Sequence, residues 1–274
     1  MCTTVPRLAA NVSMMFGEWP FPERPEAAAA AGFPAIECQF PYDWPVEMLQ
    51  QRLRAAGLPL VLLNAPPGDL AGGDRGLASV TGREAEFRAS IETALRYADG
   101  LGCPRVHVMA GVGDPSDPST VARYVDQLGW AADRLGPAGI TVQIEPLNGR
   151  DFPGYLLTGT RQAEAVIDAV GRGNLRLQFD TYHLQILEGD LLASFRRCRD
   201  VVGHVQIAAV PDRGEPDQGE VDHHWLLAQL DGAGWDGWVG AEYRPRGHTL
   251  AGLQWAWQYG IEASFVGGAA DAPQ

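Results

Sequence analysis

The chain has 274 residues, 46% of them hydrophobic, which is enough for one large domain or two smaller ones. Its net charge of -13 argues against nucleic-acid binding, because that function needs a basic patch. The sequence has no apolar run of about 18 residues, no secretory leader and no CxxC pair, so we expect no membrane span, no structural zinc and a cytoplasmic location.

Short runs rich in β-branched and other apolar residues alternate along the chain with segments of helical periodicity. In the segment 83–101, Phe87, Ile91, Ala94 and Ala98 repeat at helical spacing, and Gly102 follows as a C-terminal cap. In chain order, the predicted strands are residues 8–14, 35–40, 60–65, 105–110, 141–146, 175–180, 203–208 and 238–243. The predicted helices that follow them are residues 22–31, 46–56, 83–101, 120–135, 160–170, 191–201, 223–230 and 250–261.

Eight strands that alternate with eight helices over roughly 250 residues indicate an α/β fold, the (β/α)8 TIM barrel. The main competitor is a doubly wound sheet, which carries a GxGxxG fingerprint after its first strand, whereas this chain has SMMFGEWPF there. No linker-like stretch divides the chain. We therefore predict a single domain over residues 1–266 and a disordered tail over residues 267–274.

The carboxyl ends of the strands carry the functional side chains in this fold. The last four predicted strands each end in a residue with an oxygen ligand, and these residues are Glu145, Asp180, Gln206 and Glu242. Glu145 ends an apolar strand and precedes Pro146, a place where an ionised carboxylate is costly without a positive partner. Because consecutive strands are neighbours in a barrel, we expect the four side chains to converge.

A divalent cation would relieve the repulsion between three converging carboxylates. Hard oxygen ligands that include one neutral amide suit Mg²⁺ or Mn²⁺ better than zinc. A single acidic residue at a strand end is more often a helix cap or a loop anchor, but four in succession are harder to explain in that way. We therefore predict that Glu145, Asp180, Gln206 and Glu242 bind one divalent cation.

The two glutamates of this set also suit proton transfer. On opposite sides of a substrate carbon, Glu145 and Glu242 would act as a pair in which one takes a proton and the other returns it. A bound cation would stabilise the developing enolate oxygen. A pair of glutamates beside a divalent cation suits 1,2-isomerisation or epimerisation of a hydroxy-carbonyl compound through an enediolate.

Four further polar residues are candidates for substrate contact. His183, three residues after Asp180, is placed to bond a substrate oxygen, and Arg213 is suited to a substrate carboxylate. The alternatives are a loop histidine bonded to a backbone carbonyl and a solvated surface arginine. Asn64 and His107, at the ends of the third and fourth predicted strands, complete the candidates.

Long blocks such as IEPLNGRDFPGYLLTGTRQA, QFDTYHLQILEGDL, GHVQIAAVPDRGEPDQGEV and GWVGAEYRP resemble the hydroxypyruvate isomerase family. This family belongs to the xylose-isomerase-like TIM barrels, together with the ketose 3-epimerases. The resemblance extends over residues 8–259, nearly the whole chain. It implies that the four predicted metal ligands and the glutamate pair match those of the family.

The resemblance also bears on the substrate contacts. His183 and Arg213 fall where related epimerases contact substrate oxygens, and Asp151 falls where an epimerase relative has a substrate-binding glutamate. Gln206 stands where the epimerases usually have histidine, which favours the hydroxypyruvate isomerase branch.

The expected activity is a metal-dependent isomerisation of a small 2-oxo hydroxy acid, hydroxypyruvate to tartronate semialdehyde. A 2-oxo-tetronate isomerase and a ketose 3-epimerase are the alternatives. A metal-dependent endonuclease on abasic DNA would need more than the six histidines present and a basic groove. The intact glutamate pair argues against a sugar-binding protein without activity. The aromatic segment QWAWQYG is interpreted either as a helix face packed on the barrel or as the surface of a homo-oligomer.

Overall fold

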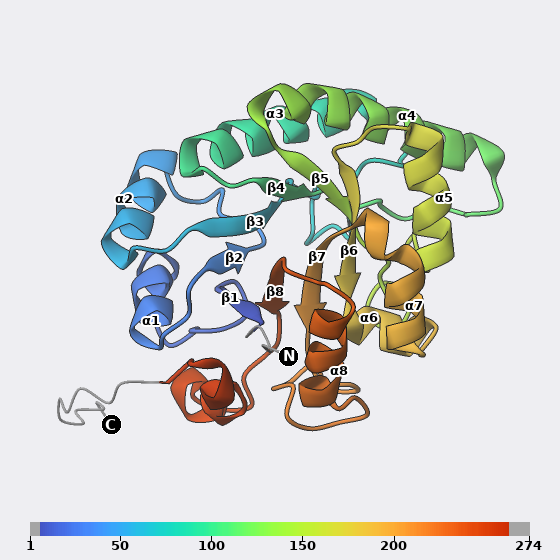
Figure 1. Ribbon diagram of the computed structural model, residues 1–274. Coiled ribbons are helices and arrows are strands. Elements are labelled where there is room, and N and C mark those ends of the chain that lie inside the picture. Colours follow the sequence, from blue (N-terminus) through green and yellow to red (C-terminus); the bar gives the residue numbers. More distant parts are fainter. Residues whose placement is uncertain (1–5, 263–274) are drawn as a thin grey trace.

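The computed structural model describes residues 6–262 and confirms a closed barrel of eight parallel strands (Figure 1). The strands pair in chain order, and β8 closes the barrel by pairing with β1. They are β1 (Arg7–Asn11), β2 (Ile36–Cys38), β3 (Leu60–Asn64), β4 (Arg105–His107), β5 (Thr141–Ile144), β6 (Leu175–Asp180), β7 (Val202–Ile207) and β8 (Trp238–Ala241). The predicted tail at 267–274 lies outside the described residues.

Helices form the outer layer around these strands (Figure 1). The α-helices are α1 (Arg24–Ala30), α2 (Val46–Ala56), α3 (Glu84–Leu101), α4 (Pro118–Leu135), α5 (Thr160–Val170), α6 (Thr181–Leu187), α7 (Leu191–Cys198) and α8 (His223–Gly232). The 3₁₀ helices are η1 (Phe21–Glu23), η2 (Gly136–Ala138), η3 (Arg199–Val201) and η4 (Thr249–Tyr259).

Two of these helices differ from the sequence prediction. The helix predicted over residues 250–261 is the 3₁₀ helix η4, and α6 is an additional helix that begins directly after β6. Asp180 explains the start of α6, since its Oδ1 accepts a hydrogen bond from the backbone N of Tyr182 at 2.8 Å.

The helices bury the apolar faces that their spacing predicts. In α3, Phe87, Ile91, Ala94 and Ala98 are all buried against the barrel, and Gly102 ends the helix with φ 66°. This left-handed conformation is one that glycine adopts without steric cost, so the chain can turn at once towards β4. No helix within residues 6–262 has the length and apolarity needed to cross a membrane.

The strand register brings the predicted site residues to one level of the barrel. Asp180 in β6 lies beside Gln206 in β7, and Asn64 in β3 lies beside His107 in β4. Glu145 and Glu242 each follow directly after the last residue of a strand, β5 and β8. All of these positions belong to the carboxyl end of the barrel, which is the end that carries the active site in this fold.

The main apolar core lies between the strands and the helices, whereas the barrel interior near its carboxyl end is polar. Asn11, Glu37, Gln178 and His204 are completely or almost completely buried there. Buried polar groups of this kind are tolerated because they bond to one another. The predicted site therefore rests on a layer of hydrogen-bonded side chains and not on an apolar floor.

The segment QWAWQYG, interpreted as a packed helix face or an oligomer surface, lies largely in η4. Trp255 is buried and its indole N donates a hydrogen bond to the Tyr243 hydroxyl at 3.3 Å. Trp257 is 53% exposed. Packing on the barrel thus accounts for one of the two tryptophans, and the oligomer stays a prediction.

Candidate active site

A cavity of about 180 Å³ lies at the carboxyl end of the barrel. It is smaller than the roughly 300 to 1,000 Å³ of sites for drug-sized ligands, which suits a small metabolite. The predicted residues that line it are Asn64, His107, Glu145, His183, Arg213 and Glu242. Asp180 and Gln206 do not line the cavity, but they are connected to residues that do, as described below.

Glu145 presents one bonded and one free carboxylate oxygen. Its Oε2 accepts a hydrogen bond from Gln178 Nε2 at 2.9 Å, whereas its buried Oε1 has no hydrogen-bond partner among the described residues. Burial raises the pKa of Glu145 well above its ordinary value, and repulsion from Asp180 and Glu242 adds to the increase. A buried carboxylate oxygen without a partner is costly, so this atom is suited to a ligand.

Asp180 is the last residue of β6, and its two oxygens face different partners. Oδ1 caps α6, and Oδ2 lies 3.5 Å from Arg213 Nη2 and 3.7 Å from His183 Nε2. Burial raises the pKa of Asp180, while Arg213 opposes the increase. Asp180 therefore connects the end of β6 to two residues of the cavity wall.

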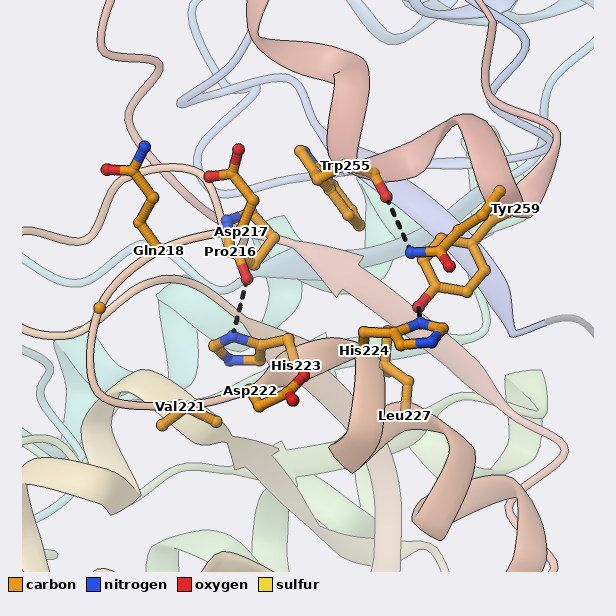
Figure 2. Close-up of a pocket in the computed structure, with 12 residues that line it drawn as sticks. Pro216, Asp217, Gln218, Val221, Asp222, His223, His224, Leu227, Trp255 and Tyr259 are labelled. Atoms are coloured by element: carbon orange, nitrogen blue, oxygen red, sulfur yellow. Dashed lines mark hydrogen bonds between the residues drawn. The ribbon is translucent and has the colours of Figure 1, made fainter.

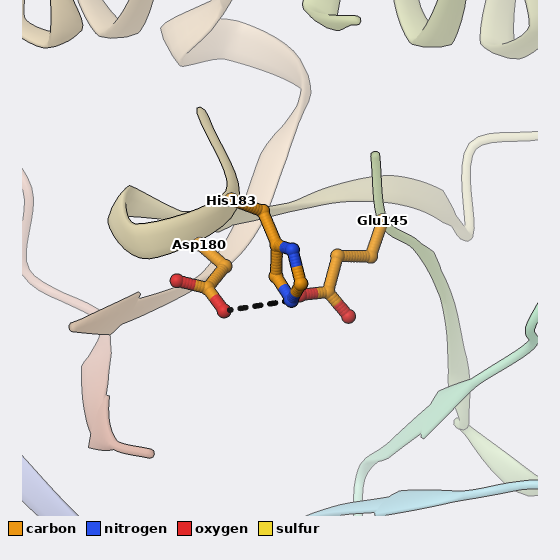
Figure 3. A group of neighbouring side chains, drawn as sticks. All are labelled: Glu145, Asp180 and His183. Carbon is orange, nitrogen blue, oxygen red and sulfur yellow. Dashed lines mark ion pairs between the residues drawn. The ribbon is translucent and has the colours of Figure 1, made fainter. Parts of the chain in front are cut away.

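One ligand atom from each of Glu145, Asp180 and His183 lies within 4.8 Å of the other two (Figure 3). The bonds of His183 indicate what its imidazole can offer. Its Nδ1 faces two donors of Asn148, the backbone N at 3.1 Å and the amide Nδ2 at 2.8 Å. Nδ1 is therefore an acceptor, and in the neutral ring Nε2 carries the proton. Burial lowers the pKa of His183 well below its ordinary value, so it is a neutral donor beside Asp180.

Gln206 is oriented by bonds at both ends of its amide. Its Oε1 accepts a hydrogen bond from Gln178 Nε2 at 2.7 Å, and its Nε2 donates one to Glu37 Oε1 at 2.7 Å. Glu37 is fixed in turn by His204 Nε2, which lies 2.6 Å from Glu37 Oε2. Gln178 thus joins Gln206 to Glu145, and the carbonyl oxygen of Gln206 faces the carboxylate side of the site.

Glu242 follows β8 and is bonded through both of its oxygens. Oε1 accepts hydrogen bonds from Asn11 Nδ2 and Gln39 Nε2, each at 3.0 Å, and Oε2 lies 2.6 Å from Arg213 Nη2. Burial raises the pKa of Glu242 to about 7, although Arg213 opposes the increase. A carboxyl group with this pKa can both accept and return a proton near neutral pH.

Arg213 lies within the carboxylate cluster and not on the surface. Besides its ion pairs with Glu242 and Asp180, its guanidinium lies 4.9 Å from the ring centroid of Tyr182. Its backbone has φ 55°, a conformation uncommon outside glycine, which hydrogen bonds with Ala209 and Arg244 support. Glu242 and Asp180 raise the pKa of Arg213 above its ordinary value despite burial. The interpretation as a solvated surface arginine is therefore wrong.

The other predicted contacts are placed differently. His107 Nδ1 lies 3.5 Å from Glu145 Oε2, and burial lowers the pKa of His107 to about 3, so the ring is neutral. Asp151 does not line the cavity, and its Oδ2 accepts hydrogen bonds from the Tyr182 hydroxyl at 2.8 Å and from Asn148 Nδ2 at 3.2 Å. Asp151 thus supports the loop that also orients His183.

Sequence reasoning missed several residues of the site. Gln178 lies two residues before Asp180 in β6, so the two side chains point to the same side of the strand. This alternation of side chains is a signal by which the sequence could have identified Gln178. Arg75, Leu70 and Phe152 also line the cavity, but they come from loops in which no periodicity marks them. Their positions depend on the tertiary structure.

The donor set fits a hard divalent cation. Ligand atoms of Glu145, Asp180 and His183 lie within 4.8 Å of one another, and this group does not include Glu242, which is linked to Asp180 through Arg213. Glu145 Oε1 is buried without a partner among residues 6–262. Arg213 is the cation that balances two of these carboxylates. Oxygen donors with a net negative charge are the ligands of Mg²⁺, Ca²⁺ and Mn²⁺. This buried group could therefore bind a metal ion.

A second cavity, of about 450 Å³, lies between the loop after β7, α8 and η4 (Figure 2). It shares no lining residue with the cavity at the barrel end. His223 in its wall contacts the Pro216 carbonyl oxygen at 3.2 Å, and His224 contacts the Tyr259 hydroxyl at 3.2 Å (Figure 2). None of the predicted site residues lines this cavity, so its larger volume does not make it the candidate active site.

Comparisons with known proteins agree with this geometry. The family model described as xylose isomerase-like TIM barrel matches residues 25–259. A 2-oxo-tetronate isomerase of Cupriavidus necator is 48% identical over 93% of this chain and 99% of its own. A hydroxypyruvate isomerase of Escherichia coli is 43% identical over 91% of this chain and 97% of its own.

A solved structure from Brucella melitensis, described as an AP endonuclease of family 2, has a TM-score of 0.91 and is 45% identical. The matched region covers 93% of this chain and 99% of the Brucella melitensis chain. The match to the family model and the identities of the relatives extend over nearly the whole barrel and all of the site. The chain therefore belongs to the xylose isomerase-like TIM barrel family and is, within it, an isomerase of the hydroxypyruvate isomerase family.

Proposed function

We propose that the protein is a metal-dependent isomerase that interconverts hydroxypyruvate and tartronate semialdehyde. One observation carries the proposal. Glu145 and Glu242, which both line one small cavity, are buried carboxyl groups whose pKa values are raised. Paired carboxyl groups of this kind can take a proton from one substrate carbon and return a proton to the next. The relative from Escherichia coli, which is named hydroxypyruvate isomerase, supports this choice of substrate.

We propose Glu145, Asp180, Gln206 and Glu242 as the residues that would hold the cation, with Mg²⁺ or Mn²⁺ as the ion. When bound, the cation supplies positive charge that stabilises the oxygen on which negative charge develops during isomerisation. The free Glu145 Oε1 and the bonded amide of Gln206 support this assignment.

The proton transfer itself falls to the side chains. One glutamate takes a proton from the hydroxymethyl carbon to give an enediolate, and the other delivers a proton to the former carbonyl carbon. The hydroxyl proton passes from the oxygen of the first carbon to the oxygen of the second, which leaves an aldehyde and a new hydroxyl group. The protonated Nε2 of His183 donates a hydrogen bond to a substrate oxygen, and its bonds with Asn148 fix that orientation. Arg213 opposes the increase in pKa that burial causes in Asp180 and Glu242, and so favours the ionised forms of both carboxyl groups.

A 2-oxo-tetronate is the second candidate substrate, since the relative from Cupriavidus necator is named for it and is 48% identical. It differs from hydroxypyruvate by one hydroxylated carbon, and the same glutamate pair would serve both. The Brucella melitensis structure bears the name of an endonuclease, which acts on DNA. The small cavity and the net charge of -13 favour either acid over such a substrate.

A substrate panel tests this proposal. The protein, supplied with Mg²⁺ or Mn²⁺, is assayed with hydroxypyruvate, 2-oxo-tetronates, free ketoses and duplex DNA that contains an abasic site. We expect turnover of hydroxypyruvate, and loss of turnover after treatment with EDTA. Turnover of a 2-oxo-tetronate without turnover of hydroxypyruvate would make the second candidate the substrate. Turnover of a ketose alone, or cleavage of the DNA alone, would overturn the proposal.

A further inference from the structure

We propose that Arg75 binds the carboxylate of the substrate and thereby selects small oxo acids over neutral sugars. The inference rests on the proposed function, which takes the substrate to be an acid. It assigns to Arg75 the contact that the sequence had suggested for Arg213. The charge balance of the cavity, the free edge of the Arg75 guanidinium and the bracing of its loop carry the argument.

The cavity has two arginines in its wall, and only Arg213 forms an ion pair with a carboxylate among the described residues. Arg213 Nη2 lies 2.6 Å from Glu242 and 3.5 Å from Asp180. Arg75 has no carboxylate within ion-pair distance in the part of the chain that the structure describes. A substrate carboxylate that approached Arg213 would have to compete with two bound carboxylates, whereas Arg75 is available for it.

Two nitrogens of the Arg75 guanidinium, Nε and Nη2, are also free to bind a ligand. Its Nη1 donates to the backbone oxygens of Leu70 at 3.2 Å and Asp74 at 2.6 Å. Its Nε and Nη2 make no hydrogen bond with any residue from 6 to 262. These two nitrogens form the fork that matches the two oxygens of a carboxylate. Because one nitrogen is already anchored, little further side-chain entropy is lost when the fork binds.

The loop that carries Arg75 is fixed at its base. Gly76 pairs with Ala110, and its N donates to the Pro67 oxygen at 3.0 Å. Gly76 has φ 108°, and a Cβ there would lie 2.3 Å from the Met109 oxygen, so only glycine fits. This close approach places the neighbouring Arg75 against the segment after β4, at the cavity wall.

A second brace lies on the outer side of the loop. Asp74 Oδ2 accepts a hydrogen bond from the Asp69 backbone N at 2.6 Å, and its Oδ1 lies 2.6 Å from Arg83 Nη1. Arg83 does not line the cavity. The loop therefore contains one arginine that faces the cavity and one that only braces the loop, which gives a matched pair for an experiment.

The first test measures binding by calorimetry with lactate, a small 2-hydroxy acid, and with propane-1,2-diol, in which a hydroxymethyl group replaces the carboxylate. We expect the wild-type protein to bind lactate more tightly than the diol. Arg75→Gln should weaken lactate binding about 10- to 100-fold, the loss of a charge-assisted pair. Arg75→Lys should recover part of the affinity. Arg83→Gln removes one brace of the loop but leaves the Arg75 fork in place, so it should weaken lactate binding less than Arg75→Gln does.

Steady-state kinetics give the second test, with hydroxypyruvate as substrate. Arg75→Gln should raise KM by about the factor found for lactate, with a smaller effect on kcat. The proposal is overturned if wild-type protein prefers the diol or does not distinguish it from lactate, if Arg75→Gln binds lactate normally, or if Arg83→Gln causes the same loss. Because lactate binding needs no turnover, it supports or overturns the role of Arg75 even in a protein that fails the substrate panel.

Discussion

At the scale of single residues, the site depends on which oxygen of each carboxylate is already bonded. Gln178 Nε2 donates to both Glu145 Oε2 and Gln206 Oε1, so one amide group fixes two of the proposed metal ligands. Glu145 Oε1 remains free of partners among the described residues. Glu242, by contrast, is bonded at both oxygens. The two glutamates thus have similar burial but different freedom to meet a substrate.

We expect Glu145→Gln and Glu242→Gln each to lower kcat by about 10²- to 10⁴-fold, because an amide cannot accept or return the proton. Both variants should remain folded, since glutamine has the same shape and removes a carboxylate from a repelling cluster. Steady-state kinetics and denaturation in urea measure the two effects. The exposed Glu47→Gln in α2 is the control, and near-normal kcat in either site variant would remove that residue from its proposed role.

At the scale of elements, strand β8 accommodates the polar layer under the site through one glycine. A Cβ on Gly240 would lie 2.3 Å from Glu37 Oε2, and Glu37 is the group that orients Gln206. We expect Gly240→Ala to lower the free energy of unfolding by about 1 to 3 kcal/mol through overpacking, and to lower kcat/KM as well.

Denaturation in urea and kinetics check the effect of Gly240→Ala. The control is Gly129→Ala in α4, where a Cβ would meet no atom within 4 Å. There the substitution should stabilise the protein by about 0.5 to 1 kcal/mol, because alanine favours a helix. Equal stability of the two variants would show that β8 does not need the glycine.

The start of α8 provides a pH-dependent contact. His223 lies near Thr181 Oγ1 at 3.1 Å and the Pro216 oxygen at 3.2 Å, and burial lowers its pKa to about 4 from 6.5. The unfolded state then binds the proton more readily than the folded state. The free energy of unfolding therefore contains a contribution from neutral His223 that is complete above about pH 6.5. This contribution decreases by about 3 kcal/mol as the pH falls to about 4.

We therefore expect His223→Gln to reduce the difference in unfolding free energy between pH 7 and pH 4 by about this amount. Urea denaturation at the two pH values measures that difference, whatever the variant does to stability at pH 7. The exposed neighbour His224→Gln serves as the matched control. An unchanged pH dependence in His223→Gln would contradict the assignment.

The elements also show what the sequence could predict. The closed barrel followed from short apolar runs that alternate with helical segments, since strands buried on both faces appear in the sequence as nearly continuous apolar runs. The predicted strands continued too far, because Glu145 and Glu242 lie just beyond the strands that position them. Helix α6 was missed although Asp180 is a capping residue, since its seven residues carry little periodicity. Arg75 was beyond prediction because a loop, not a repeat, places it.

At the scale of the whole molecule, closure of the barrel brings together groups that are far apart in the chain. Asn11 from β1 donates to Glu242 after β8, and His204 from β7 contacts Glu37 from β2. An open sheet would not join its first and last strands in this way. The polar layer and the carboxylates above it are therefore a product of the complete fold.

The central claim is that this fold gathers four oxygen ligands around one divalent ion. An anomalous difference map from a crystal grown with Mn²⁺ tests it most directly. We expect one peak at the barrel end, about 2.0 to 2.6 Å from oxygens of Glu145, Asp180, Gln206 and Glu242. A map with no peak there, or with a peak that touches none of the four, would contradict the account.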